Sequence, residues 1–118
     1  MQEQIKKRTK QIGLDIIKLI DELPNKASAQ AIAKQIIRSS TSIGANYRAV
    51  CRAKSSADFV YKLKIVEEEA DETHYWLEIL EESELIHSER ITLLKKEINE
   101  IISIVVSSIK TSRTNNSK

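Results

Sequence analysis

The stretch that decides the fold runs from Arg38 to Leu80 and reads RSSTSIGANYRAVCRAKSSADFVYKLKIVEEEADETHYWLEIL. Two helical patterns meet within it at a short polar break, Lys54-Ser55-Ser56. The first pattern is basic and has small residues in its middle, whereas the second is acidic and holds the only Phe and the only Trp. Because a short link makes consecutive helices antiparallel, the stretch predicts two antiparallel helices.

The composition favours long helices in a single domain spanning residues 1–118. Two Gly and one Pro provide little turn chemistry, and Ile, Leu, Ala, Glu and Lys are abundant. No apolar run approaches the roughly 20 residues that span a bilayer, and the charged start MQEQIKKRTK lacks the apolar stretch of a signal peptide. A single cysteine, Cys51, permits no intrachain disulfide. We therefore expect a cytoplasmic protein.

Toward the N-terminus, the pattern predicts helices over about residues 4–23 and 28–53. The first has a stripe of Ile5, Ile12, Ile16, Leu19 and Leu23, and Pro24 ends it. We expect its lysine-rich first turns to fray. The second is capped by Asn25 or Ser28 and has a stripe of Ile32, Ile36, Ser39, Ile43, Asn46 or Tyr47, and Val50. Its small residues, including Gly44, predict that another backbone comes close.

The third helix is predicted over 56–82, after a capping box formed by Ser55 and Asp58. It has two apolar stripes rather than one. The first is a core stripe, and the second comprises Tyr61, Ile65, Trp76 and Ile79, with Glu69 and Glu72 between them. Because a lone bundle needs one stripe per helix, we interpret the second as a subunit interface anchored by Trp76. The alternative is a wider core with this helix at its centre.

The fourth helix is predicted over 88–111, with Ser88 as its N-cap and a disordered polar tail over 112–118. The three connections are short, so successive helices run antiparallel. The predicted fold class is therefore all-α, an up-down-up-down antiparallel four-helix bundle.

Charge is strongly segregated along the chain. Residues 1–64 hold 13 Lys and Arg against 5 Asp and Glu, whereas residues 65–118 hold 6 against 12. Such asymmetry indicates either an anionic partner or two halves that pair with each other in the fold.

A basic strip on the second helix is the most informative feature for function. Lys34, Arg38, Arg48 and Arg52 fall within a sector of about 80° at 3.6 residues per turn, and Lys54, Lys62 and Lys64 lie near its end. Arg offers bidentate donors that match phosphate oxygens, so the strip is suited to a nucleic-acid backbone. The competing interpretation is an intersubunit or interhelix salt-bridge seam with the acidic half. In that seam Arg38 or Arg48, from this subunit or a neighbour, meets Glu69 and Glu72.

Signals for catalysis are weak. Two glycines cannot supply a nucleotide-binding loop, and Cys51 inside a helix is typical of a small core residue rather than a nucleophile. A di-iron bundle needs two Glu-x-x-His motifs, and only Asp71-x-x-His74 approximates one. We expect no enzyme activity, no metal and no cofactor.

The central residues resemble the four-helix bundle family of ribosomal RNA intervening-sequence proteins, which are encoded within bacterial large-subunit ribosomal RNA genes or free-standing. The resemblance rests on four blocks: Arg38-Ser39-x-Thr41-Ser42-Ile43-Gly44-Ala45-Asn46; Ala49-x-x-Arg52-Ala53-Lys54-Ser55; Asp58-Phe59-x-x-Lys62-x-x-Ile65-x-x-Glu68-Glu69-x-Asp71-Glu72; and Trp76-Leu77. It covers about residues 12–109.

This resemblance implies a ring-like homopentamer. It also implies kinship with the accessory variability protein of diversity-generating retroelements, a basic pentamer that binds nucleic acid and a reverse transcriptase. Nucleic-acid binding, and a reverse transcriptase or other protein partner, follow for this chain only by analogy.

Three hypotheses follow for function. The leading one is a non-enzymatic homo-oligomer that binds the backbone of RNA or DNA through Lys34, Arg38, Arg48, Arg52, Lys54 and Lys62. The interface of that oligomer comprises Tyr61, Ile65, Glu69, Glu72, Trp76 and Ile79. The second is a protein–protein scaffold or adaptor without a nucleic-acid role, and the third is an enzyme.

Overall fold

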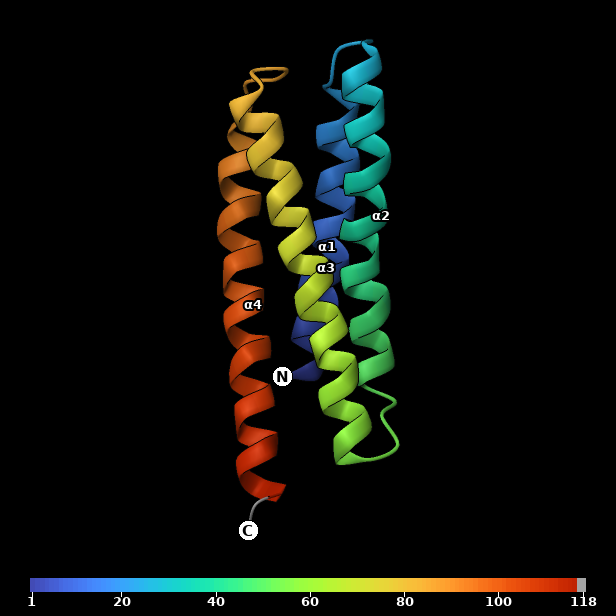
Figure 1. Cartoon of the computed structure of the whole chain (residues 1–118), viewed down its shortest axis with the longest axis vertical. Coiled ribbons are helices and arrows are strands. Elements are labelled where there is room, and N and C mark those ends of the chain that lie inside the picture. The colour runs from blue at the N-terminus through green and yellow to red at the C-terminus, as the bar shows by residue number, and fades with distance from the viewer. Residues whose placement is uncertain (117–118) are drawn as a thin grey trace.

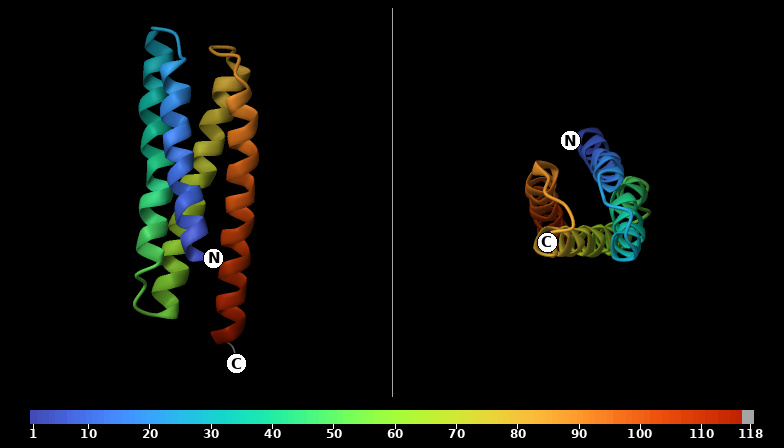
Figure 2. Two further views of the ribbon diagram at one scale, coloured as in Figure 1. Left: turned by 180° about the vertical axis from the view of Figure 1, so that it is seen from behind. Right: turned by 90° about the horizontal axis from the view of Figure 1, so that it is seen from above.

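Four helices account for nearly all of the chain in the computed structural model, which describes residues 1–116 (Figure 1). They are α1 (Gln2–Asp21), α2 (Ala27–Val50), α3 (Ser56–Glu82) and α4 (Glu89–Asn116). Successive helices run in opposite directions, and α1 also touches α4, so the helices surround one core (Figure 2). The Cα trace measures 54 × 21 × 20 Å. The predicted all-α class and its four helices are confirmed, and over residues 1–116 no helix is long and apolar enough to cross a membrane.

The core is aliphatic and takes one stripe from each helix. The stripes predicted for α1 and α2 are largely buried, although Leu23 and Ile32 lie at the margin and Asn46 is half-buried. The Asn46 side chain bonds within its own helix, because its Nδ2 donates to the Ser42 carbonyl 2.8 Å away. The α3 and α4 stripes complete the core with Leu63, Val66, Ala70, Leu77, Leu80, Ile91, Leu94, Ile98, Ile101, Val105 and Ile109.

The helices α1 and α2 approach each other closely where their small residues meet. A Cβ added at Gly44 would lie 3.3 Å from the Lys10 backbone nitrogen and 3.3 Å from the Thr9 carbonyl carbon. The same test at Gly13 gives an ordinary contact of 3.4 Å with the Thr41 Cγ2. The backbone approach predicted from the small residues of α2 is therefore confirmed, and the backbone concerned is that of α1.

The helix ends follow local capping chemistry in some places and depart from the sequence expectation in others. Ser55 Oγ accepts a hydrogen bond from the Asp58 backbone N–H at 3.0 Å, as the capping box predicts. Ser88 Oγ accepts from the Arg90 N–H at the start of α4. Neither predicted cap of α2 is used: Lys26 is the N-cap residue, without a side-chain bond, and Asn25 instead binds the Gln30 amide.

Several helix ends differ from the expected bounds. The first turn of α1 is helical from Gln2, with Lys6 paired to Glu3 at 3.3 Å, although fraying was expected. The end of α2 is at Val50, three residues before the expected end, because Arg52 and Ala53 donate in a tight turn to Ala49 and Val50.

The expectation of a disordered tail over 112–118 is wrong for residues 112–116, which continue α4; residues 117–118 lie outside the described residues. Polar residues without Gly or Pro do not stop a helix, and Arg113 in the last turn favours the helix dipole. As a result, α4 extends beyond the first turn of α1 (Figure 1).

We expect alanine substitutions at Gly13 and Gly44 to change the free energy of unfolding differently. Gly13→Ala should raise the free energy of unfolding by up to about 1 kcal/mol, because helix propensity improves and the Cβ has room. Gly44→Ala should give no gain or a loss, because its Cβ pushes on the backbone of α1. Chemical denaturation of both variants measures the difference, and equal gains would contradict the close approach.

Candidate nucleic-acid interface

A buried polar contact fixes α2 against α3. Ser39 and Thr73 have no solvent exposure, and Thr73 Oγ1 lies 2.8 Å from Ser39 Oγ and 2.8 Å from the Glu69 carbonyl oxygen. Ser39 Oγ also reaches the Ile36 carbonyl at 3.3 Å. Because the two hydroxyls satisfy each other and the backbone, the contact avoids the cost of an unpaired buried polar group. It sets which turn of α3 faces the basic strip of α2.

An ion-paired cluster lies on the surface beside this contact. Arg38 donates to Glu69 Oε2 at 3.3 Å and to Glu72, and the Trp76 Nε1–H donates to Glu72 at 3.3 Å. The hydrogen bond from Arg38, helped by that from Trp76, holds the pKa of Glu72 below its ordinary value despite partial burial. The same pairing raises the pKa of Arg38. Of the two cations considered for Glu69 and Glu72, Arg38 of the same chain is therefore the partner.

The remaining predicted phosphate-binding residues divide into paired and exposed groups. Lys62 Nζ lies 2.8 Å from Asp58 Oδ2, and this bond, with the Lys54 backbone N–H, lowers the pKa of Asp58. Lys34, Arg48, Arg52 and Lys54 have exposed side chains. Over residues 1–116 these four have no carboxylate within ion-pair distance. The predicted residues are thus ion-paired at Arg38 and Lys62, and the other four are exposed cations without an ion pair over residues 1–116.

Sequence reasoning missed the lysines of α1 that lie beside Arg48. A groove of about 430 Å³ runs between α1 and α2, and Lys6, Lys7, Lys10 and Arg48 line it. Its floor is made by the closely packed small residues, including Gly13 and Gly44. The run KKRTK contains these lysines, but in the sequence alone it indicates only a helix start that frays. We call Lys7, Lys10, Arg48, Arg52 and Lys54 the basic end of the α1–α2 face.

Most of the second stripe of α3 is half-buried within the chain itself. Ile65, Glu69, Glu72, Trp76 and Ile79 are all half-buried, and only Tyr61 is exposed. Trp76 packs against the core, and its ring meets Tyr75 edge-on at 5.1 Å. Trp76 therefore contributes to the core of its own chain, whether or not it also meets a second copy, and Tyr61 and Tyr75 are the exposed aromatic side chains of α3.

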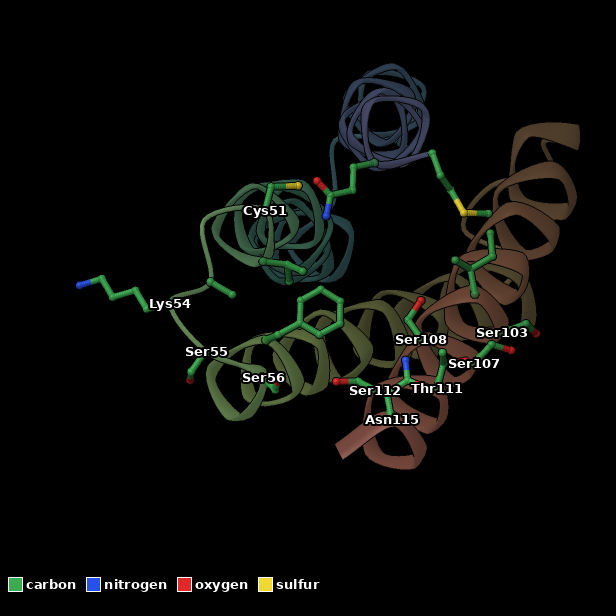
Figure 3. Close-up of a pocket in the computed structure, with 16 residues that line it drawn as sticks. Cys51, Lys54, Ser55, Ser56, Ser103, Ser107, Ser108, Thr111, Ser112 and Asn115 are labelled. Carbon is green, nitrogen blue, oxygen red and sulfur yellow. The ribbon is translucent and has the colours of Figure 1, made fainter. Parts of the chain in front are cut away.

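A second hollow, of about 870 Å³, lies at the end of the bundle where α4 extends past α1. Hydroxyl side chains of α4 line one side, including Ser108, Thr111 and Ser112, and Cys51 lies across from them (Figure 3). Lys54 is the one charged residue in its lining, and its side chain points away from the hollow (Figure 3). The serine and threonine hydroxyls of this lining offer hydrogen bonds to a ligand.

The approximate metal motif does not assemble into a cluster. His74 Nδ1 lies 2.9 Å from Glu78 Oε1, while Asp71 is exposed to solvent. Among residues 1–116, no group of three or more His, Cys, Asp or Glu side chains is placed to hold a metal ion.

Fold and surface together define the class of protein: an all-α four-helix bundle with uncompensated cations at one end of its α1–α2 face. The chain belongs to the family of 23S rRNA-intervening sequence proteins, whose family model matches residues 1–107.

Among solved structures, the chain is similar to a protein of unknown function from the S23 ribosomal protein family of Bacteroides thetaiotaomicron VPI-5482, determined at 1.70 Å resolution. The two are 40% identical with a TM-score of 0.82, over 90% of this chain and 98% of the other. No curated protein matches the chain.

The Arg38–Glu72 pair should make stability depend on pH. Because folding lowers the pKa of Glu72, its stabilising contribution is present above the ordinary Glu pKa and is lost as pH falls through the folded-state value. At pH 7, Glu72→Gln should lower the free energy of unfolding by less than about 1 kcal/mol, since the pair is partly exposed. Denaturant unfolding of both proteins between pH 7 and pH 3 should show this difference shrinking; a constant difference would contradict the assignment.

Proposed function

We propose that this protein is a non-enzymatic homo-oligomeric bundle that binds the phosphate backbone of RNA or DNA through the basic end of its α1–α2 face. The observation that carries the proposal is the juxtaposition of Arg48 of α2 with Lys7 and Lys10 of α1 along one groove. These cations have no carboxylate partner over residues 1–116, so their charge is available to an anion.

The distribution of charge supports a backbone contact rather than base reading. No acidic residue lies within α2, whereas α3 carries nine Asp and Glu against two Lys. Because negative charge is kept on α3, a polyanion meets little repulsion at the basic end. The exposed aromatic side chains, Tyr61 and Tyr75, are on α3, so bases have no stacking platform beside these cations. Binding should therefore be sensitive to salt and tolerant of sequence.

The family is named for intervening sequences of 23S rRNA, and the S23 relative shares 40% of its residues over nearly its whole length. The proposal covers both RNA and DNA, because either offers the phosphate backbone. A ring-like homopentamer is implied by the resemblance of the central residues, and it would multiply the basic ends in one particle. Several weak phosphate contacts held together give a much higher total affinity than one.

A charge-reversal pair tests the nucleic-acid surface. Arg48→Glu with Arg52→Glu should weaken binding of labelled structured RNA or duplex DNA at least tenfold. The slope of log affinity against log salt should fall by about 2, one for each phosphate contact removed. Fluorescence anisotropy titrations at two salt concentrations measure both quantities, and circular dichroism checks that the variant remains helical.

A matched control distinguishes the effect of the basic end on binding from the effect of net charge. Lys96→Glu with Lys110→Glu makes the same change in net charge at exposed positions on α4. This variant should bind nearly as well as the wild type. Equal loss in both double variants, or unchanged affinity in the first, would reject the basic end as the site.

A further inference from the structure

The α1–α2 face exposes large apolar side chains on its other half, toward the C-terminus of α1 and the N-terminus of α2. Leu14 is 44% exposed, Ile17 41% and Ile37 38%. Leu14 and Ile17 line the α1–α2 groove, and Gly13 lies against Thr41. Because the helices are antiparallel, Ile17, one turn after Gly13, comes beside Ile37, one turn before Thr41. These three residues form a contiguous surface that we call the aliphatic patch.

The outer face of α3 exposes aromatic and acidic side chains in a seven-residue repeat. Tyr61, Glu68, Tyr75 and Glu82 recur at this spacing, which keeps them on one side of the helix. All four are exposed, with Tyr61 at 65% and Tyr75 at 54%. The two rings are about 21 Å apart along the axis at 1.5 Å per residue. We call this surface the tyrosine face.

We propose that the aliphatic patch is a docking surface for a second copy of this chain, which presents its tyrosine face. This inference rests on the homo-oligomer in the proposed function and names the two surfaces that meet. It replaces the half-buried Trp76 with the exposed Tyr61 and Tyr75 as the aromatic anchors. Large amphipathic rings on one partner and aliphatic side chains on the other are a favourable pairing at an interface.

Charge complementarity selects the tyrosine face over a second aliphatic patch. Lys10, Lys18 and Lys34 are exposed around the aliphatic patch. Two such patches facing each other would bring these lysines together, and like charges across an interface disfavour binding. The tyrosine face instead offers Glu68, Asp71 and Glu82, against a single Lys64. The contact is therefore heterologous, joining different surfaces of the two copies.

The shape of the bundle allows this contact to continue from copy to copy. The diagonal arrangement places α3 across the core from α1, so one copy can use both surfaces at once (Figure 2). A heterologous contact used in this way builds a closed ring or a filament. One side of the bundle, 54 Å long and about 20 Å wide, exceeds the roughly 800 Å² per partner that a stable interface buries. Arg52 and Lys54 of the basic end follow the last residue of α2 and lie beyond the patch.

The test uses two variants that each block one surface. Leu14→Glu with Ile37→Glu places acids in the aliphatic patch, and Tyr61→Lys with Tyr75→Lys places bases on the tyrosine face. The wild type should have a mass that is a multiple of 13.4 kDa in light scattering at micromolar concentration. Each blocked variant should have the mass of one chain. Mixed together, they should associate into a species of at least two chains, because one intact surface remains on each.

Controls make the result specific. Leu93→Glu changes a 67% exposed residue of α4 outside both surfaces and should leave the wild-type mass unchanged. Circular dichroism establishes that each blocked variant is folded. If a double variant unfolds, the milder Ile17→Ala and Tyr61→Ala replace it, and each should raise the protein concentration at which the oligomer forms. A wild-type mass in either blocked variant would overturn the proposal, as would a mixture that stays at the mass of one chain.

The oligomer, its surfaces and nucleic-acid binding can fail separately. A monomeric wild type rejects the oligomer and the docking surfaces together. An oligomeric wild type with unaffected blocked variants rejects the surfaces alone. Anisotropy titration of the patch-blocked variant, with and without Arg48→Glu and Arg52→Glu, tests the basic end whatever the mass is.

Discussion

Close packing of α2 against both of its neighbours is the constraint on which the rest of the structure depends. On one side, Gly44 lets the backbone of α1 approach to a distance that leaves no room for a side chain. On the other, the buried hydroxyls of Ser39 and Thr73 meet at 2.8 Å. Glycine and serine are poor helix formers and add little apolar burial, so their contribution at these positions is to let neighbouring helices come close. They fix the rotation of α2 and therefore the direction in which its cations point.

That rotation gives the cations of α2 two different environments. Arg38 faces α3 and is compensated by Glu69 and Glu72. Arg48, in the last turn of α2, instead lies beside the lysines of α1. The charge asymmetry of the sequence left an anionic partner and internal pairing as alternatives. Pairing inside the chain accounts for Arg38 and Lys62, whereas the cations of the basic end have no such ion pair over residues 1–116.

Much of the fold was predictable because its signals are local. Apolar spacing gives the four stripes, and Ser55 with Asp58 marks the start of α3 through short-range bonds. The helix ends were less predictable, because the turn after Val50 and the continuation of α4 to Asn116 involve no Gly or Pro. The lysines of α1 were missed for a different reason. Their importance comes from a neighbour, Arg48, that is about forty residues away in the sequence.

The second stripe of α3 shows how tertiary structure changes the meaning of a periodic pattern. Trp76 and Glu72 recur at helical spacing with Ile65, which is also the pattern of an interface. In the fold they pack beside α2, where Arg38 holds Glu72 and Glu72 accepts the indole N–H. An intrachain partner uses most of the stripe, and the docking surface that we propose lies on residues rotated further toward solvent. Tyr61 and Tyr75 occupy that position, and their exposure follows from the same α2–α3 packing that buries Trp76.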